Sequence, residues 1–328
     1  MEKVFITGIE GFVGEHLLQE LLSHNYKVVG LYYTDLSAVH LEKYGIPLYA
    51  GDITDRKDIW EILDKVEPNT IIHLAAITSI PQSIQFPMNT WKVNLWGTLN
   101  IMEWIRQRKP QTKLLAISSG EVYGIPDSED ELPFTEKNSL KPVNIYASTK
   151  AAAEMAARQY RNIWKLPIVI ARPFNHIGPG QSNKFVASAF AKQIAEIMEK
   201  KIEPIVRVGN LLAHRDFLDV RDVVRAYRML ISDESIFYQK NDNLPVGNRI
   251  VFNICSGNPI EIQTILDMLI DISDIEVEIE IDSNKFRPID IPIIYGSHEK
   301  ITKRTGWRPD IPLRKTLNDT LQYWLEKM

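Results

Sequence analysis

The chain opens with an apolar segment, a turn containing three glycines and an amphipathic stretch, in the run VFITGIEGFVGEHL. Gly8, Gly11 and Gly14 fall where a strand would pass into a helix. Glycine lets the backbone turn tightly and lets a ligand approach closely, and the N-terminus of a helix favours a phosphate charge. A purely structural turn is the alternative. In this context we predict a dinucleotide pyrophosphate site, which restricts the fold to parallel sheets wrapped by helices.

The first half of the chain alternates strand-like and helix-like segments, as this fold requires. The strand-like segments are 3–8, 27–33, 47–52, 70–76, 113–119 and 167–174. We predict an α/β protein with a Rossmann-type, doubly wound parallel sheet and a smaller C-terminal substrate-binding α/β part. Residues 1–172 are expected to form the NAD(P)-binding domain and residues 173–328 the substrate-binding part, of which segments such as 210–235 can pack back on the first domain.

Composition excludes several other classes of protein. The 328 residues are 45% hydrophobic and carry a net charge of −4, so there is no basic footprint for nucleic acid. One cysteine, Cys255, lies in an apolar run, which favours a buried thiol and a reducing compartment. No run reaches the length of a membrane span, and the first strand begins too close to Met1 for a signal peptide. We expect a cytoplasmic protein with no membrane contact and no metal site.

A second signal is the segment NIYASTK, which holds Tyr146 and Lys150 four residues apart on one helical face. A lysine ammonium beside a phenol lowers the phenol pKa and suits it to proton transfer. Lys150 can also hold the nicotinamide ribose. A surface pair is the alternative, but the position after the glycine turn and after ISSGEVYG (117–124) favours catalysis.

The adenosine end of the expected cofactor site is less clear. Tyr32 and Tyr33 stand where an acid would contact the ribose, and Asp35 comes slightly late. Neither an acid that favours NAD nor an arginine that favours NADP is evident, so the choice between these cofactors stays open. Asp52 in GDITD is expected to accept from the adenine amino group, although a helix cap by Asp52 or Thr54 fits as well.

Together these motifs resemble the extended short-chain dehydrogenase/reductases that act on nucleotide sugars. The resemblance runs end to end, through TGIEGFVG, GDITD, HLAA, NLWGT, the serine block ISSGEVYG (117–124), YASTK, RPFNHIGPGQ, RDFLDVRDV, FNICSG, FRPIDIPIIYGS and TGWRP. It is strongest to the GDP-sugar branch, which holds GDP-mannose 4,6-dehydratases and GDP-4-keto-6-deoxymannose reductases.

The resemblance implies roles for individual residues. Ser119, Tyr146 and Lys150 would form the catalytic triad, and Glu121 is a further catalytic candidate. The implied cofactor contacts are Gly8, Gly11, Phe12, Val13, Gly14, Tyr33, Asp52, Ile53, Leu74, Ala75, Ala76, Asn94, Tyr146 and Lys150, with Asn94 in a structural role. The implied contacts to the GDP-sugar are Ser79, Asn175, Lys184, Val186, Arg215, Arg287 and Asp290, with the two arginines on the diphosphate.

The resemblance also implies an enzyme acting at carbon 4 of a sugar, and reduction of GDP-4-keto-6-deoxymannose is the leading interpretation. Gly120 offers no side chain to assist loss of water, which weighs against a 4,6-dehydratase, although Glu121 is a candidate base. A 4-epimerase or 4-dehydrogenase remains an alternative, and the intact Tyr146 and Lys150 argue against a non-enzymatic cofactor sensor. A homodimer is expected through helices 90–107 and 146–164.

Overall fold

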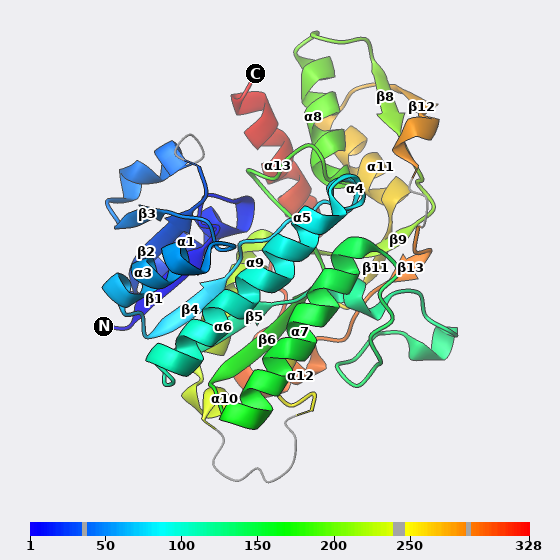
Figure 1. Ribbon diagram of the computed structural model, residues 1–328. Helices are drawn as coiled ribbons and strands as arrows, with labels where there is room; N and C mark the ends of the chain where they lie inside the picture. Colours follow the sequence, from blue (N-terminus) through cyan, green and yellow to red (C-terminus); the bar gives the residue numbers. More distant parts are fainter. Residues whose placement is uncertain (35–37, 239–246, 287–289) are drawn as a thin grey trace.

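The structure is a computed structural model that describes residues 1–34, 38–238, 247–286 and 290–328. Its centre is a seven-stranded sheet in the order β10-β6-β5-β4-β1-β2-β3, in which every neighbouring pair is parallel (Figure 1). The strands are β1 (Lys3–Thr7), β2 (Lys27–Tyr32), β3 (Leu48–Ala50), β4 (Thr70–His73), β5 (Lys113–Ile117), β6 (Ile168–Pro173) and β10 (Val251–Ile254). The predicted Rossmann-type fold is confirmed, and the observed strands are shorter than the predicted ones mainly at their carboxyl ends.

Helices cover both faces of this sheet because each presents one apolar side to it. On one face lie α1 (Phe12–Ser23), α9 (Val220–Ser232) and α12 (Glu299–Thr305), and on the other lie α3 (Arg56–Val66), α6 (Gly97–Arg108) and α7 (Ile145–Trp164). The buried positions of α1, Leu17, Leu18 and Leu21, follow the helical period. A continuous helical stretch, α5 (Pro87–Trp91), a π-helical turn (Lys92–Trp96) and α6, replaces the single predicted helix 90–107.

The chain after residue 172 contributes β10, α9 and α12 to this body and builds a smaller part above it. There α8 (Val186–Met198), α11 (Ile262–Ser273) and α13 (Leu313–Glu326) share one apolar core (Figure 1). The pair β8 (Ile205–Val208) and β12 (Glu278–Ile281) forms one small sheet; β7 (Asn175–Ile177), β9 (His214–Asp219), β11 (Pro259–Glu261) and β13 (Ile293–Ile294) form another. Two short α-helices, α4 (Ile80–Gln85) and α10 (Glu234–Phe237), and the 3-10 helices Val39–Tyr44, Gly120–Tyr123, Glu129–Glu131 and Ser283–Lys285 complete the described helices.

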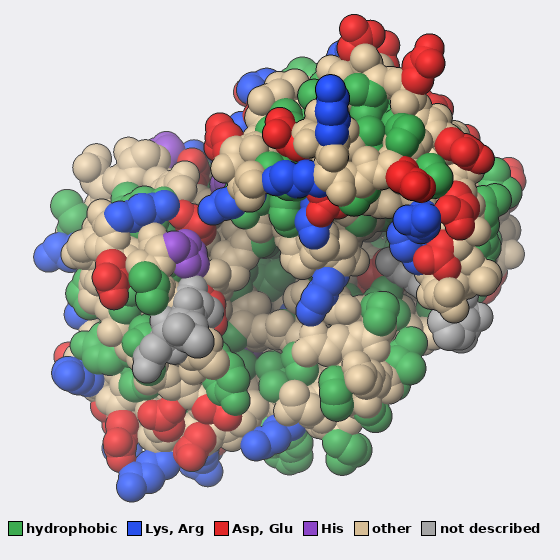
Figure 2. Space-filling view, turned by 90° about the horizontal axis from the view of Figure 1, so that it is seen from above, with side chains coloured by type: hydrophobic (Ala, Val, Ile, Leu, Met, Phe, Trp, Pro, Cys, Tyr) green, Lys and Arg blue, Asp and Glu red, His purple; other side chains and the backbone are tan. Residues whose placement is uncertain are grey.

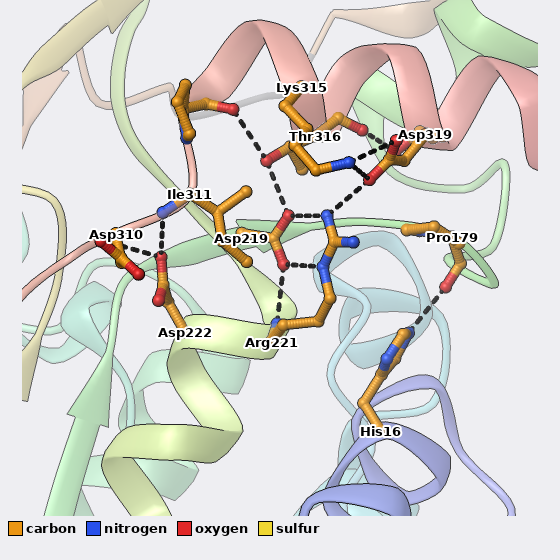
Figure 3. Close-up of polar contacts among 12 residues, drawn as sticks. His16, Pro179, Asp219, Arg221, Asp222, Asp310, Ile311, Lys315, Thr316 and Asp319 are labelled. Carbon is orange, nitrogen blue, oxygen red and sulfur yellow. Dashed lines mark hydrogen bonds and ion pairs between the residues drawn. The ribbon is translucent and has the colours of Figure 1, made fainter.

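The second half of the RDFLDVRDV motif joins the two parts. Asp219 caps α9 through Arg221 N, pairs with the Arg221 guanidinium and accepts from Thr316 on α13 (Figure 3). Arg221 also reaches Asp319 on α13, and Asp222 accepts from the backbone N–H groups of residues 310 and 311. These contacts hold α13 against the end of β9 and the start of α9, so the motif has a structural explanation without any ligand.

Among the described residues, no helix combines the length and the apolar character needed to cross a membrane.

Candidate active site

A cavity of 730 Å³ lies at the carboxyl ends of the central strands, between the large and the small part of the protein. It appears from above as a hollow in the space-filling surface (Figure 2). The end of a parallel sheet, next to the first βα turn, is where dinucleotides bind in doubly wound folds. The glycine turn, the ends of β2 to β6 and the start of α8 all contribute to its wall.

The glycine turn lines the cavity and leaves no room for a side chain at Gly8 or Gly14. Gly8 has φ +69°, and a Cβ atom there would lie 2.9 Å from the backbone of Ala75. A Cβ atom on Gly14 would lie 2.4 Å from the carbonyl oxygen of Ile9. Helix α1 begins at Phe12 with no side-chain cap on its first N–H groups. A close backbone, free N–H groups and the helix dipole suit the pyrophosphate of a dinucleotide.

Most of the residues predicted to bind the cofactor line this cavity. They are Gly8, Gly11, Phe12, Val13, Gly14, Tyr33, Asp52, Ile53, Leu74, Ala75, Ala76 and Tyr146. Asp52 accepts from Thr54 N at 2.8 Å, a local turn just before Asp55 caps α3, so the predicted cap falls on Asp55. Asn94 and Lys150 lie behind the lining.

Asn94 is buried and ties the cavity wall to the catalytic helix. Its Oδ1 accepts from Ile77 N at 2.8 Å, and its Nδ2 donates to the Ile77 carbonyl and to Thr149 Oγ1 on α7. Sequence reasoning missed a second buried link, His73, which lies between Thr7 and Thr98. Burial lowers the pKa of His73 to about 3, so this histidine is neutral and structural.

Ser119 and Tyr146 meet at the cavity, one from the end of β5 and the other from the first turn of α7. Asn144 caps α7 through Ala147 N at 2.8 Å, which places Tyr146 in that first turn. Burial raises the pKa of Tyr146 to about 12, a hydrogen bond with Ser119 opposes this rise, and the charge of Glu121 adds to it. The sequence expectation of a lowered phenol pKa is therefore wrong for this arrangement, because burial outweighs the lowering contributions.

Lys150 lies one turn further along α7, with its ammonium on the backbone of β5. Its Nζ donates to the carbonyl oxygen of Ile117 at 2.6 Å, and burial lowers its pKa to about 8. The amine therefore stays largely protonated at neutral pH while being easier to deprotonate than an exposed lysine. This leaves Ser119 and Tyr146 as the two side chains of the triad that face the cavity.

A buried ion pair stands directly behind these residues, and sequence reasoning missed it. Arg172 donates to Glu154 at 2.9 and 2.5 Å and to Tyr123 Oη at 2.6 Å, and both charged side chains are fully buried. Ser118, the neighbour of Ser119, donates to Glu154 at 2.8 Å. The signal in the sequence was Glu154 one turn after Lys150, on the same helical face.

Gly120, which follows Ser119, has no room for a side chain because the ring of Phe174 packs against it. A Cβ atom on Gly120 would lie 2.9 Å from the ring of Phe174. Glu121, the next residue, lines the cavity, and Asn144 Nδ2 lies 3.4 Å from its Oε2. The serine block therefore presents one hydroxyl and one carboxylate to the cavity, with no side chain between them.

The predicted substrate residues divide into two groups. Ser79, Asn175, Lys184 and Val186 line the cavity. Arg215 is buried and donates to Asp290 at 2.7 Å and to the Ile291 carbonyl, and neither Arg215 nor Asp290 is part of the lining. The pair instead joins β9 to the loop before β13, and Arg287 lies outside the described residues.

Comparisons with known proteins agree with this geometry. Residues 5–320 match the family described as GDP-mannose 4,6 dehydratase. The GDP-6-deoxy-D-mannose reductase of Pseudomonas aeruginosa is 33% identical over 98% of this chain and 97% of its own length, and a GDP-mannose 4,6-dehydratase of Vibrio cholerae is 25% identical over 96% and 91%. The solved structure of RMD from Pseudomonas aeruginosa complexed with NADPH aligns with a TM-score of 0.85 at 32% identity and covers 100% of both chains. The chain belongs to the GDP-mannose 4,6-dehydratase family and is an NAD(P)-dependent enzyme of the short-chain dehydrogenase/reductase type.

Proposed function

We propose that this enzyme reduces the keto group at carbon 4 of GDP-4-keto-6-deoxymannose. The observation that carries the proposal is the serine block, in which Ser119 and Tyr146 meet at the cavity while the ring of Phe174 fills the space beside Gly120. That pair supplies what a ketone reduction needs from the protein, and the filled space leaves no group at position 120 to assist loss of water. The reductase of Pseudomonas aeruginosa, which aligns over nearly the full chain, supports the same reaction.

In the proposed reaction the bound nicotinamide supplies the hydride that carbon 4 receives. Tyr146 donates its phenolic proton to the carbonyl oxygen, which becomes the hydroxyl of the product. Ser119 donates a hydrogen bond to the same oxygen and stabilises the negative charge that develops on it. Lys150, a buried cation one helical turn away, favours the transient phenolate and orients the cofactor ribose. The sugar thus gains one hydride and one proton, which together reduce its keto group to a hydroxyl.

Four lining residues, Ser79, Asn175, Lys184 and Val186, are proposed to hold the GDP-sugar. Lys184 is the cation among them and is suited to the diphosphate. We assign Arg215 and Asp290 to the support of this wall, because their charges are already satisfied by each other and by the backbone.

The test is to give the purified enzyme two substrates in separate reactions. With the GDP-linked 4-keto sugar and reduced cofactor we expect cofactor oxidation, followed by absorbance, and a 4-hydroxy product. With GDP-mannose and oxidised cofactor we expect no 4-keto-6-deoxy product. Conversion of GDP-mannose, or no oxidation with the keto sugar, would contradict the proposal.

The 4,6-dehydratase is the second candidate, because Glu121 lines the cavity and its charge acts on Tyr146. A dehydratase needs a base for the proton on carbon 5, and Glu121 is the carboxylate beside the proton donor. Replacing Glu121 with glutamine separates the two roles: ketone reduction should survive within about tenfold, whereas an elimination that depends on the base would fall by about 10²-fold or more.

The quaternary structure is also proposed, as a homodimer through α6, α7 and the helical stretch before α6. The exposed apolar side chains of this region are Ile84, Phe86, Met88, Trp96, Met155, Ile163 and Trp164. These helices run side by side on one face (Figure 1), and a cluster of exposed apolar residues marks a protein interface. We propose a cytoplasmic location as well, since the single cysteine is a free, buried thiol.

A further inference from the structure

The glycine turn carries one charged side chain, Glu10, and its carboxylate lies at the end of β2. Glu10 Oε1 accepts a hydrogen bond from Tyr33 N at 2.9 Å, and Tyr33 directly follows β2. The other oxygen, Oε2, is buried and has no hydrogen-bond partner among the described residues. Glu10 also lines the cavity. A buried carboxylate oxygen without a donor carries a desolvation cost that a ligand hydroxyl would remove.

The end of β2 is the position that recognises the adenosine ribose in doubly wound folds. There an acid accepts from the 2′-hydroxyl of NAD, or an arginine accommodates the 2′-phosphate of NADP. In this chain Tyr32 and Tyr33 stand at that strand end, and neither is acidic. The hydrogen bond from Tyr33 N brings the Glu10 carboxylate to the same place from the neighbouring turn. The acid that β2 lacks is thus supplied by the glycine turn.

The charges around the cavity also favour a ribose without a 2′-phosphate. Among the described lining residues, the glycine turn and the segments after β2 and β3 bring two charged groups, the carboxylates of Glu10 and Asp52. The lysines of that lining, Lys92 and Lys184, come from the π-helical turn before α6 and from the loop before α8. A phosphate added at the ribose would therefore enter next to a carboxylate, and like charges that close repel strongly.

We propose that Glu10 is the cofactor-selecting residue and that it makes NAD(H) preferred over NADP(H). Its Oε2 accepts from a hydroxyl of the adenosine ribose, and its charge opposes the 2′-phosphate. The inference deepens the proposed reductase and rests on the same cofactor site, but it concerns binding rather than turnover. It also separates this chain from the Pseudomonas protein, whose structure holds NADPH.

The test measures the dissociation constants of NADH and NADPH for the wild type and for Glu10→Gln by fluorescence titration without any sugar. The wild type should bind NADH at least about tenfold more tightly than NADPH, since a lost charge-assisted hydrogen bond and a like-charge contact each change affinity by about tenfold or more. Glu10→Gln keeps the shape of the side chain and removes its charge. The dissociation constant of NADPH divided by that of NADH should therefore fall by about tenfold, mainly because NADPH binds more tightly.

A matched control is Glu61→Gln on α3, which removes the same charge from a side chain that is 68% exposed and outside the cavity. Its ratio should stay within about twofold of the wild type, because exposed charges at a distance are screened. Wild-type enzyme that binds NADPH as tightly as NADH would overturn the proposal, even if the variant did not fold. So would a Glu10→Gln variant that changes both affinities equally, or a wild type that binds neither cofactor.

The outcome is distinguishable from failure of the reductase itself. If the wild type prefers NADH through Glu10 but does not oxidise it with the 4-keto sugar, the cofactor assignment stands and the proposed substrate is wrong. If the keto sugar is reduced equally well with both cofactors and both bind equally, the function stands and the role of Glu10 is refuted.

Discussion

Removing the buried carboxylate of Glu154 should destabilise the enzyme severely. Its partner Arg172 is fully buried and donates to it through Nε and Nη2. Glu154→Gln replaces the charge with a neutral amide and leaves the guanidinium without a counter-charge. Breaking a buried pair from one side costs about 3–5 kcal/mol. We expect the free energy of unfolding in urea, followed by circular dichroism at fixed protein concentration, to fall by about that amount.

Two further variants test the reasoning behind this magnitude. Glu299→Gln breaks an exposed pair with Lys303 and should leave the urea midpoint unchanged. The double variant Glu154→Met, Arg172→Met removes both charges and fills the space with apolar atoms, so it should recover more than half of the loss. A single variant as stable as the wild type, or a double variant less stable than the single one, would refute the account of this ion pair.

The stability that Glu154→Gln loses should depend on pH, in a direction that the pKa of Glu154 determines. Burial alone raises the pKa of Glu154, but the hydrogen bonds and charges of Arg172 and Arg158 outweigh it, and the net pKa lies below the ordinary value of 4.5. A lowered carboxyl pKa adds stability that is fully present above the unfolded-state pKa and is lost as the pH falls through the folded-state pKa. The stability difference between wild type and Glu154→Gln should therefore be constant above about pH 5 and narrow in more acidic solution.

Three more perturbations follow from the site and the surface. Tyr146→Phe removes the proton donor and should lower kcat by about 10²- to 10⁴-fold while cofactor dissociation constants change by less than about twofold; retained activity would remove Tyr146 from the reaction. Gly120→Ala puts a Cβ atom 2.9 Å from the Phe174 ring and should cost about 1–3 kcal/mol in urea unfolding, and unchanged stability would show that the ring gives way freely. Trp96→Glu places a charge on the proposed dimer face and should shift sedimentation toward the monomer, whereas Leu212→Glu, at a more exposed side chain on the smaller part, should not; a wild-type monomer would contradict the dimer.

The fold was predictable from local patterns because the apolar segments of strands and the 3.6-residue apolar period of helices are both clear in this chain. Glycine spacing and alternating apolar segments identify β1, α1 and the parallel order of the first strands. The lengths were less predictable, since β4 and β5 end before HLAA and ISS do and pass into loops that line the cavity. An apolar run indicates that a segment is buried. Loops beside a cavity are buried as well, so an apolar run cannot show where the strand ends and the loop begins.

The site was predictable where each residue stands in a recognisable motif, as Ser119 does in ISSGEVYG and Tyr146 does in NIYASTK. It was not predictable where the contact joins segments far apart in the sequence. The pairing of Arg215 with Asp290 and that of Arg172 with Glu154 are such cases, and a sequence shows the charges but not their partners. Glu10 shows the same limit: an acid was sought in the sequence at the end of β2, whereas the carboxylate that accepts from Tyr33 N there belongs to Glu10, in the turn before α1.

The central claim is that hydride reaches carbon 4 of a keto sugar while the side chains of this cavity supply the proton. The most direct measurement uses reduced cofactor that carries deuterium at the transferable position, with the GDP-linked 4-keto-6-deoxy sugar as substrate, and analyses the product by mass spectrometry and NMR. The account predicts one deuterium per product molecule, bonded to carbon 4, and the same labelled product formed about 10²- to 10⁴-fold more slowly by Tyr146→Phe. A product without deuterium, or with deuterium at another carbon, would contradict it.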